Sequence, residues 1–131
     1  MAPTSYGHLQ MMTARYVRAH LDGRSVVNRE THAPIALTWQ RGIDQIAVPG
    51  KPVEMLLAVP AIPEMLAGAR YLGAAPDPQR RADIARVHGF ASAVEVGGRT
   101  AEMLMVVREN RQGRLVLDRM EHRDGTDARA A

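Results

Sequence analysis

The residue types that could do chemistry gather in the last third of the chain. Arg86 and His88 alternate along one predicted strand, Glu102 and Arg108 lie on the next, and Arg119 lies on a third. Cleavage of RNA by its own 2′-hydroxyl needs a general base, a general acid and a cation beside the phosphate, which are tasks for these side chains. We therefore expect His88 as acid or base, with Glu102 and Arg108 as catalytic partners.

Three further arginine positions are the expected phosphate ligands. They are Arg86, Arg119 and Arg41, the last on the polar side of a predicted helix. Every basic residue except Lys51 is arginine, and a planar guanidinium donates paired hydrogen bonds to phosphate. A GC-rich genome that replaces lysine by arginine would explain the same composition. The net charge of +3, from 17 basic and 14 acidic residues, permits a nucleic-acid partner without arguing for one.

Several other chemistries have no support in the sequence. The absence of cysteine excludes disulfides, thiolate nucleophiles and cysteine-based metal sites. The histidines show neither an HExxH motif nor a close His-x-His spacing, and glycine-rich phosphate loops and nucleophile elbows are absent, so we expect no metal and no cofactor. A structural role remains open for the candidate residues, because a strand histidine commonly packs and strand-end arginines are commonly solvated.

The elements that must position these residues are three extended runs. They are Ile84 to Val96, Thr100 to Glu109 and Arg114 to Met120. Gly97-Gly98 joins the first two as a two-residue turn, because glycine tolerates the positive φ that both central positions need. Asn110 to Gly113 forms the second turn. Together they predict an antiparallel three-stranded meander.

The Gly97-Gly98 turn also sets a register between the first two strands. We expect one face to pack on the helices, with its members in opposed rows: Val94, Ser92, Phe90 and His88 against Ala101, Met103, Met105 and Val107. The other face would carry Val87, Gly89, Ala91, Ala93 and Glu95, with Glu102, Leu104, Val106 and Arg108. A slip of one residue would exchange the faces.

Helical spacing dominates the first half of the chain. An amphipathic helix from His8 to Leu21, with its apolar residues at Leu9, Met12, Tyr16 and Ala19, should end at Asp22-Gly23. Short helices are predicted at Trp39 to Val48 and at Val53 to Ala69, the latter split by Pro60 and Pro63. Extended segments are predicted at Ser25 to Asn28 and Ile35 to Thr38, which form a small hairpin, and at Arg70 to Ala74, which precedes an exposed loop over residues 75–83.

These elements predict one α+β domain over residues 1–131. N-terminal helices should pack on a mainly antiparallel sheet that ends in the meander, with residues 1–7 and 121–131 as flexible tails. No stretch reaches the length of a membrane span and the N-terminus lacks a signal-peptide pattern, so we expect a cytoplasmic protein without a membrane partner.

The order of motifs resembles a known family. The runs DGRSVVNRETHAPIALTWQRGIDQI, LLAVPAIPEMLAGARYLGAAPD and IARVHGFASAVEVGGRTAEMLMVVREN resemble the large polyvalent protein-associated domains of phage and mobile-element proteins, grouped with barnase, EndoU, colicin and RelE-like nucleases. The likeness covers about Gly23 to Met120. It implies a barnase/RelE-like fold and RNA cleavage on the sheet surface. Those nucleases differ in their catalytic residues, so the resemblance transfers no catalytic residue by motif alone. His88, in the VHGF stretch, is the one position where the resemblance and the chemistry expected from the residues agree. In the family pattern a basic residue or histidine often follows the Gly-Ile pair, whereas here Ile43 is followed by Asp44 and Gln45.

Two other function classes stay open. The first is a non-catalytic module that binds a host target, an inhibitor or another protein, supported by the eight methionines, which adapt well to partner surfaces. The second is nucleic-acid binding without cleavage, which the near-balance of charge makes the weakest of the three. The partners expected are therefore RNA first and a protein second.

Overall fold

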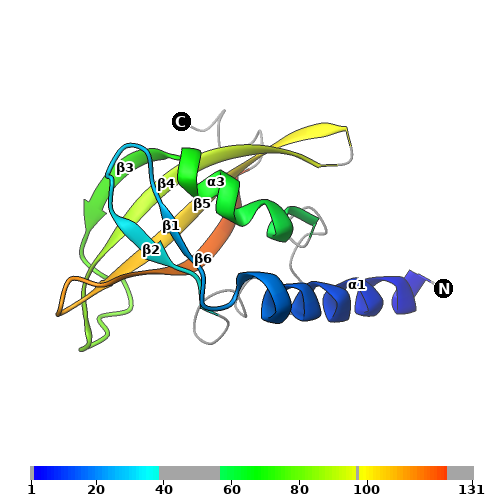
Figure 1. Ribbon diagram of the computed structural model, residues 1–131, viewed down its shortest axis with the longest axis horizontal. Helices are drawn as coiled ribbons and strands as arrows, with labels where there is room; N and C mark the ends of the chain where they lie inside the picture. Colours follow the sequence, from blue (N-terminus) through cyan, green and yellow to red (C-terminus); the bar gives the residue numbers. More distant parts are fainter. Residues whose placement is uncertain (1, 39–56, 97, 124–131) are drawn as a thin grey trace.

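The protein folds as a six-stranded sheet that curls around short helices (Figure 1). A computed structural model describes residues 2–38, 57–96 and 98–123. The strand order is β1-β2-β6-β5-β4-β3, and every neighbouring pair is antiparallel except β2 with β6. The strands are β1 (Ser25–Val27), β2 (Pro34–Ala36), β3 (Arg70–Ala75), β4 (Ile84–Val96), β5 (Arg99–Asn110) and β6 (Leu115–Arg123). This architecture confirms the predicted α+β class and mainly antiparallel sheet, with one parallel pair added.

The register predicted from the glycine turn is confirmed. Val96 pairs with Arg99, and His88 pairs with Val107 further along the same ladder. Gly98 has a φ of 79°, which the tight turn requires. β6 runs to Arg123, three residues beyond the predicted end of this strand. The meander β4-β5-β6 therefore has the predicted connections and a longer last strand.

The N-terminal helical segment buries a different face from the one predicted. It comprises α1 (Ala2–Tyr16) and the single π-helical turn η1 (Val17–Leu21), closed by Gly23 with a φ of 87°. Thr13, Val17 and Leu21 are buried, whereas Met12, Tyr16 and Ala19 of the predicted apolar stripe are exposed. Thr13 can lie inside because its hydroxyl donates to the Leu9 carbonyl at 2.7 Å. The prediction that Met12, Tyr16 and Ala19 form the packing face was wrong.

The second helical region follows its prolines as predicted. Pro60 lies at the start of the 3-10 turn η3 (Val59–Ala61), and Pro63 at the start of α3 (Ile62–Gly68), where a missing backbone donor costs no helical hydrogen bond. The predicted helix at residues 39–48 lies outside the described residues. No helix in the described ranges has the length and apolar character to cross a membrane.

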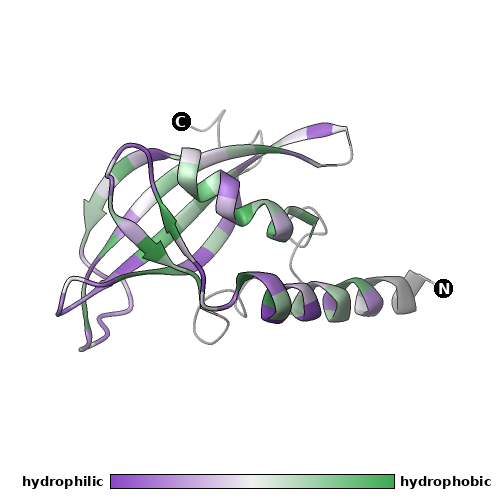
Figure 2. Cartoon of the chain, in the orientation of Figure 1, coloured by the Kyte–Doolittle hydropathy of each residue, from purple (hydrophilic) through white to green (hydrophobic). Residues whose placement is uncertain are grey.

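The main core fills the space between the inner face of the sheet and the helices. We call the core side of the sheet its inner face and the opposite side its outer face. As predicted, Phe90, Met103, Met105 and Val107 lie on the inner face and pack with residues of η1, η3 and α3. The apolar colouring in Figure 2 runs along the middle strands and α3. A smaller cluster of Ile84, Val87 and Val106 lies on the outer face.

Asn28 ties the β1-β2 hairpin to α3. Its side chain is fully buried, and its amide donates to the carbonyls of Leu66 at 2.8 Å and Ala69 at 3.0 Å. Its oxygen accepts the backbone N–H groups of Glu30 at 2.9 Å and Thr31 at 3.0 Å. All four hydrogen-bonding positions of the amide are used. This side chain connects the β1-β2 hairpin to the end of α3, directly before β3 begins. The role of Asn28 is therefore structural.

Candidate functional site

His88 is the centre of a polar cluster on the inner face. Its Nε2 lies 2.7 Å from Oε1 of Glu109, and its Nδ1 lies 2.8 Å from the hydroxyl of Tyr71. Both ring nitrogens therefore have hydrogen-bonding partners, which fix the plane of the imidazole. Arg86 places its Nη1 3.7 Å from the same carboxylate oxygen of Glu109. We call Tyr71, His88, Glu109 and Arg86 the His88 cluster.

The His88 cluster is recessed but open to water. The side chains of His88 and Glu109 are 16% and 19% exposed, and that of Arg86 is 53% exposed. The cluster lies at the end of the sheet where β4 begins and β5 ends, because Arg86 pairs with Glu109 there. An imidazole, a carboxylate and a cation are thus within reach of a small part of a larger ligand.

The backbone around Tyr71 helps to hold its side chain in this cluster. The Tyr71 N–H donates to Oε1 of Glu30, which lies in the turn between β1 and β2, at a distance of 2.8 Å. The Tyr71 ring lies between those of His88 and Phe90, with centroid distances of 5.8 Å and 5.2 Å. Packing on one side and hydrogen bonding on the other therefore direct the phenol hydroxyl toward Nδ1 of His88.

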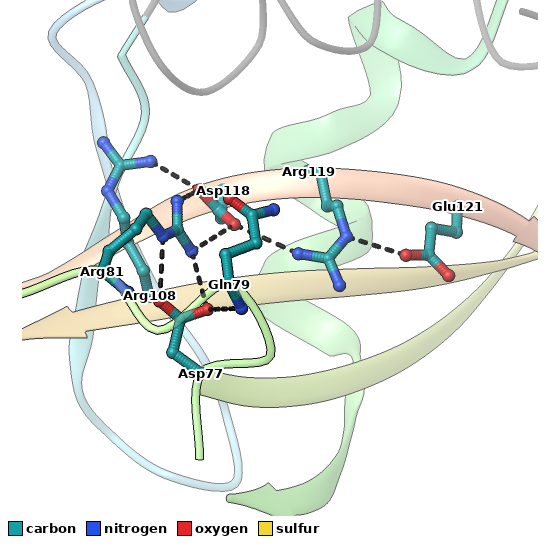
Figure 3. A network of polar contacts seen from close by, with 7 residues as sticks. All are labelled: Asp77, Gln79, Arg81, Arg108, Asp118, Arg119 and Glu121. Carbon is teal, nitrogen blue, oxygen red and sulfur yellow. Dashed lines mark hydrogen bonds and ion pairs between the residues drawn. The ribbon is translucent and has the colours of Figure 1, made fainter. Parts of the chain in front are cut away.

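A second polar cluster lies on the outer face, around the buried carboxylate of Asp118 (Figure 3). Arg81 donates to both oxygens of this carboxylate, with Nη1–Oδ1 and Nη2–Oδ2 distances of 3.0 Å each. Arg108 donates at 2.9 Å and Arg119 at 3.2 Å. The set is completed by Asp77, which binds Arg81, and by Glu121, which binds Arg119. We call these six residues the Asp118 network.

A β-bulge in β6 places the network's centre. Val106 pairs with Arg119 and Val107 pairs with Leu117, so Asp118 is the extra residue between two ladder pairs. Such a bulge turns two successive side chains to one face instead of opposite faces. Asp118 and Arg119 consequently both reach the outer face, while Leu117 and Met120 stay in the core.

The two carboxylates of the Asp118 network hold their charge strongly. The hydrogen bond from the Arg81 side chain holds the pKa of Asp77 well below its usual range. Burial alone would raise the pKa of Asp118, but the hydrogen bonds and charges of Arg81 and Arg108 outweigh it and lower that pKa. The same two carboxylates raise the pKa of Arg81 above its ordinary value. The loop over residues 75–83 is exposed at most positions, as predicted, and it is anchored to the sheet through the buried Asp77 and the half-buried Arg81.

The structure separates the catalytic residues predicted together. His88 and Arg86 lie on the inner face, but Arg108 pairs with Val87 and Glu102 pairs with Ala93, which places both on the outer face. Glu102 and Arg108 are also six residues apart on one strand, about 20 Å at the usual rise per residue. The predicted grouping of Glu102 and Arg108 with His88 is thus not found.

The two predicted phosphate ligands that the structure describes are likewise divided. Arg119 belongs to the Asp118 network on the outer face, and Arg86 lies beside His88. Arg41 lies outside the described residues.

Sequence reasoning missed Glu109 and Tyr71 as partners of His88. The signal for Glu109 was available, since the register set by the glycine turn pairs it with Arg86, two ladder pairs from His88 and therefore on the same face. Tyr71 gave no such signal, because it belongs to β3, whose pairing with β4 includes a register shift between Tyr71 and Gly73. In the part of the chain that the structure describes, no three acidic or histidine side chains converge to hold a metal ion.

Comparison with known proteins gives one match. The family model of large polyvalent protein-associated domain 3 matches residues 4–120. No curated protein and no solved structure matches significantly. The matched range includes the His88 cluster, all of the Asp118 network except Glu121, and nearly the whole sheet, so the chain belongs to the family of large polyvalent protein-associated domain 3.

Proposed function

We propose that the domain is a metal-independent ribonuclease whose active site is the His88 cluster. The observation that carries this proposal is the contact of His88 with both Tyr71, at 2.8 Å, and Glu109, at 2.7 Å, beside the exposed guanidinium of Arg86. Two proton-transfer groups in direct contact, with a cation next to them, match the needs of transesterification by the 2′-hydroxyl. The barnase/RelE-like grouping implied by the sequence resemblance belongs to the same proposal.

In this proposal Glu109 takes the role first assigned to Glu102. The Glu109 carboxylate removes the proton of the 2′-hydroxyl while the 2′-oxygen attacks phosphorus. The bond from phosphorus to the 5′-oxygen breaks, and the protonated imidazole of His88 leaves its contact with Glu109 to donate the Nε2 proton to that leaving oxygen. A proton then passes from Glu109 to His88 across their 2.7 Å hydrogen bond, which restores the starting state. The products are a 2′,3′-cyclic phosphate and a 5′-hydroxyl.

Arginines at the same end of the sheet support an anionic substrate. Arg86 is more than half exposed, and Arg111 and Arg114 are exposed in the turn that directly follows Glu109. Arg111 also donates to the carbonyl of Ala82 at 3.2 Å, which holds its guanidinium near the start of β4. Guanidinium groups around a recessed acid-base pair would bind the phosphates that flank the cleaved bond.

The test is cleavage of a fluorescent RNA oligonucleotide by purified protein in EDTA. We expect cleavage with a cyclic phosphate product by mass spectrometry, and none when a 2′-deoxynucleotide occupies the scissile position. His88→Gln should lower the rate by about 100-fold or more, the usual contribution of a general acid or base. The matched control is Glu102→Gln on the outer face, which should cleave at the wild-type rate. Absence of cleavage, or an unchanged rate in His88→Gln, would contradict the proposal.

A further inference from the structure

The outward face of α1 carries large apolar side chains that the fold leaves uncovered. Met11 is 46% exposed, Met12 is 53% exposed, and Tyr16 on the next turn is also exposed. In Figure 1 the N-terminal half of α1 extends away from the sheet. Figure 2 shows apolar and polar bands alternating around this helix. We call Met11, Met12 and Tyr16 the α1 stripe.

The α1 stripe is not needed to attach the helix to the domain. Thr13, Val17 and Leu21 make that attachment, and their spacing of four residues puts them together on a side of the helix that differs from the stripe. Val17 and Leu21 are completely buried in the main core. The exposed side is therefore available while the helix stays anchored.

The charged side chains of α1 and η1 next to the α1 stripe are both basic. Arg15 and Arg18 are exposed, as are the imidazoles of His8 and His20, and the first acidic residue along the chain is Asp22, directly after η1. The rings of Tyr16 and His20 lie 4.7 Å apart, which extends the flat surface of the stripe by one turn. This side of the helix is both apolar and basic, and it complements a surface that is both apolar and acidic.

We propose that α1 docks an acidic amphipathic helix of a partner protein. Met11 and Met12 would adapt to the apolar residues of that helix, while its carboxylates would meet the basic residues around Arg15. This inference goes beyond RNA cleavage and does not depend on it, since α1 carries no residue of the His88 cluster.

Other occupants fit this surface less well. A second copy of the same helix would bring like charges together, which opposes association. RNA offers phosphate for the arginines but little that suits two exposed methionines. A bilayer surface favours large apolar residues such as Trp, Phe and Leu. Leu21, at the end of this helical segment, is buried in the main core and cannot contact a bilayer.

The test compares two labelled helical peptides of about 20 residues. Both carry leucine at helical spacing, and the remaining positions are glutamate in one and lysine in the other. By fluorescence anisotropy we expect the acidic peptide to bind at least about tenfold more tightly, and its affinity to fall several-fold as salt rises from about 50 to about 300 mM. Arg15→Glu should weaken binding of the acidic peptide and strengthen binding of the basic one.

A matched pair of variants tests the apolar half of the proposal. Met12→Ser combined with Tyr16→Ser should weaken binding of the acidic peptide about tenfold. Leu72→Ser, an equally exposed apolar residue on β3, should leave it unchanged. Circular dichroism of each variant checks that the helix is retained.

Four outcomes would overturn this docking proposal. The first two are equal binding of the two peptides and equal effects of the α1 and Leu72 variants. The third is preferential binding of anionic vesicles or RNA through the α1 stripe, and the fourth is a dimer in solution that the α1 variants dissociate, which would assign the stripe to self-association. None of these readouts involves RNA cleavage, so failure here is distinguishable from failure of the ribonuclease proposal.

Discussion

The two polar clusters of this domain use similar residue types for different ends. In the Asp118 network three guanidiniums converge on one buried carboxylate, and each charge is compensated within the network. In the His88 cluster a single imidazole links a phenol to a carboxylate, and the accompanying arginine is mostly in water. Compensated buried charge holds structure in place, whereas a recessed titratable group next to water can exchange protons. Arginine and acid in proximity do not by themselves mark an active site.

Their positions in the sheet agree with this division. The Asp118 network forms at a bulge in the middle of the β5-β6 ladder and holds the 75–83 loop against the outer face. The His88 cluster forms where β4 begins and β5 ends, so it lies at one end of the β4-β5 ladder and is partly exposed there. Four changes would test the comparison.

Removing the central carboxylate should have the largest effect. Asp118→Ala leaves the guanidiniums of Arg81 and Arg108 partly buried without their acceptor, which should lower the free energy of unfolding by about 3 to 5 kcal/mol. Urea denaturation measures this loss. RNA cleavage per folded molecule should stay at the wild-type value below the melting temperature, and a specific loss of activity would break the division between the clusters.

Glu109→Gln should have the opposite profile. The amide keeps the size of the side chain and can still accept a hydrogen bond from His88, so the free energy of unfolding should change by less than about 1 kcal/mol. The cleavage rate should fall about 100-fold because an amide cannot accept the 2′-hydroxyl proton. Parallel urea and cleavage assays compare the two effects, and a large stability loss with intact cleavage would make Glu109 structural.

Acid should weaken the Asp118 network. The pKa of Asp118 is lower in the folded protein than its ordinary value of 3.8, so its contribution to stability is complete above that value and is lost as pH falls through the folded pKa. We expect the free energy of unfolding of the wild type to fall below about pH 4, and that of Asp118→Asn to fall less over the same range. Denaturation series at several pH values test this, and parallel curves would show that Asp118 does not carry the effect.

A matched pair of arginine variants gives the smallest effects. Arg86→Gln and Arg119→Gln each remove a guanidinium with substantial exposure, so each should change the free energy of unfolding by no more than about 0.5 to 1 kcal/mol. Only Arg86→Gln should slow RNA cleavage, by about tenfold, because a phosphate-binding cation contributes electrostatic stabilisation. Equal cleavage by both variants would remove Arg86 from the site.

The elements that depend on local chemistry were predictable. Gly97-Gly98 fixed the β4-β5 register, Gly23 ended the first helical segment, and Pro60 and Pro63 divided the second. Each of these residues restricts or frees the backbone at its own position, so its effect survives in any compatible tertiary fold. The α1 packing face was not predictable from hydrophobicity, because a threonine satisfied by its own helix lies inside.

The site was only partly predictable for a related reason. His88 and Arg86 were found from their residue types, but Glu102 was chosen as partner although the same register placed it on the other face. Residue type alone does not tell which carboxylate meets which cation. Asp118 shows the limit most clearly, since strict alternation along β6 would separate it from Arg119, and a bulge brings them together.

The strands, the turns and the register of the glycine hairpin follow from the order of residues, because they depend on backbone preferences that act over a few positions. The folded arrangement was needed to show that Tyr71 and Glu109 are the partners of His88, that Asp118 binds three arginines, and that α1 leaves Met11 and Met12 exposed. Those contacts join segments whose approach depends on how the sheet curls and where its ladder slips, and side-chain spacing along one strand or helix does not encode either.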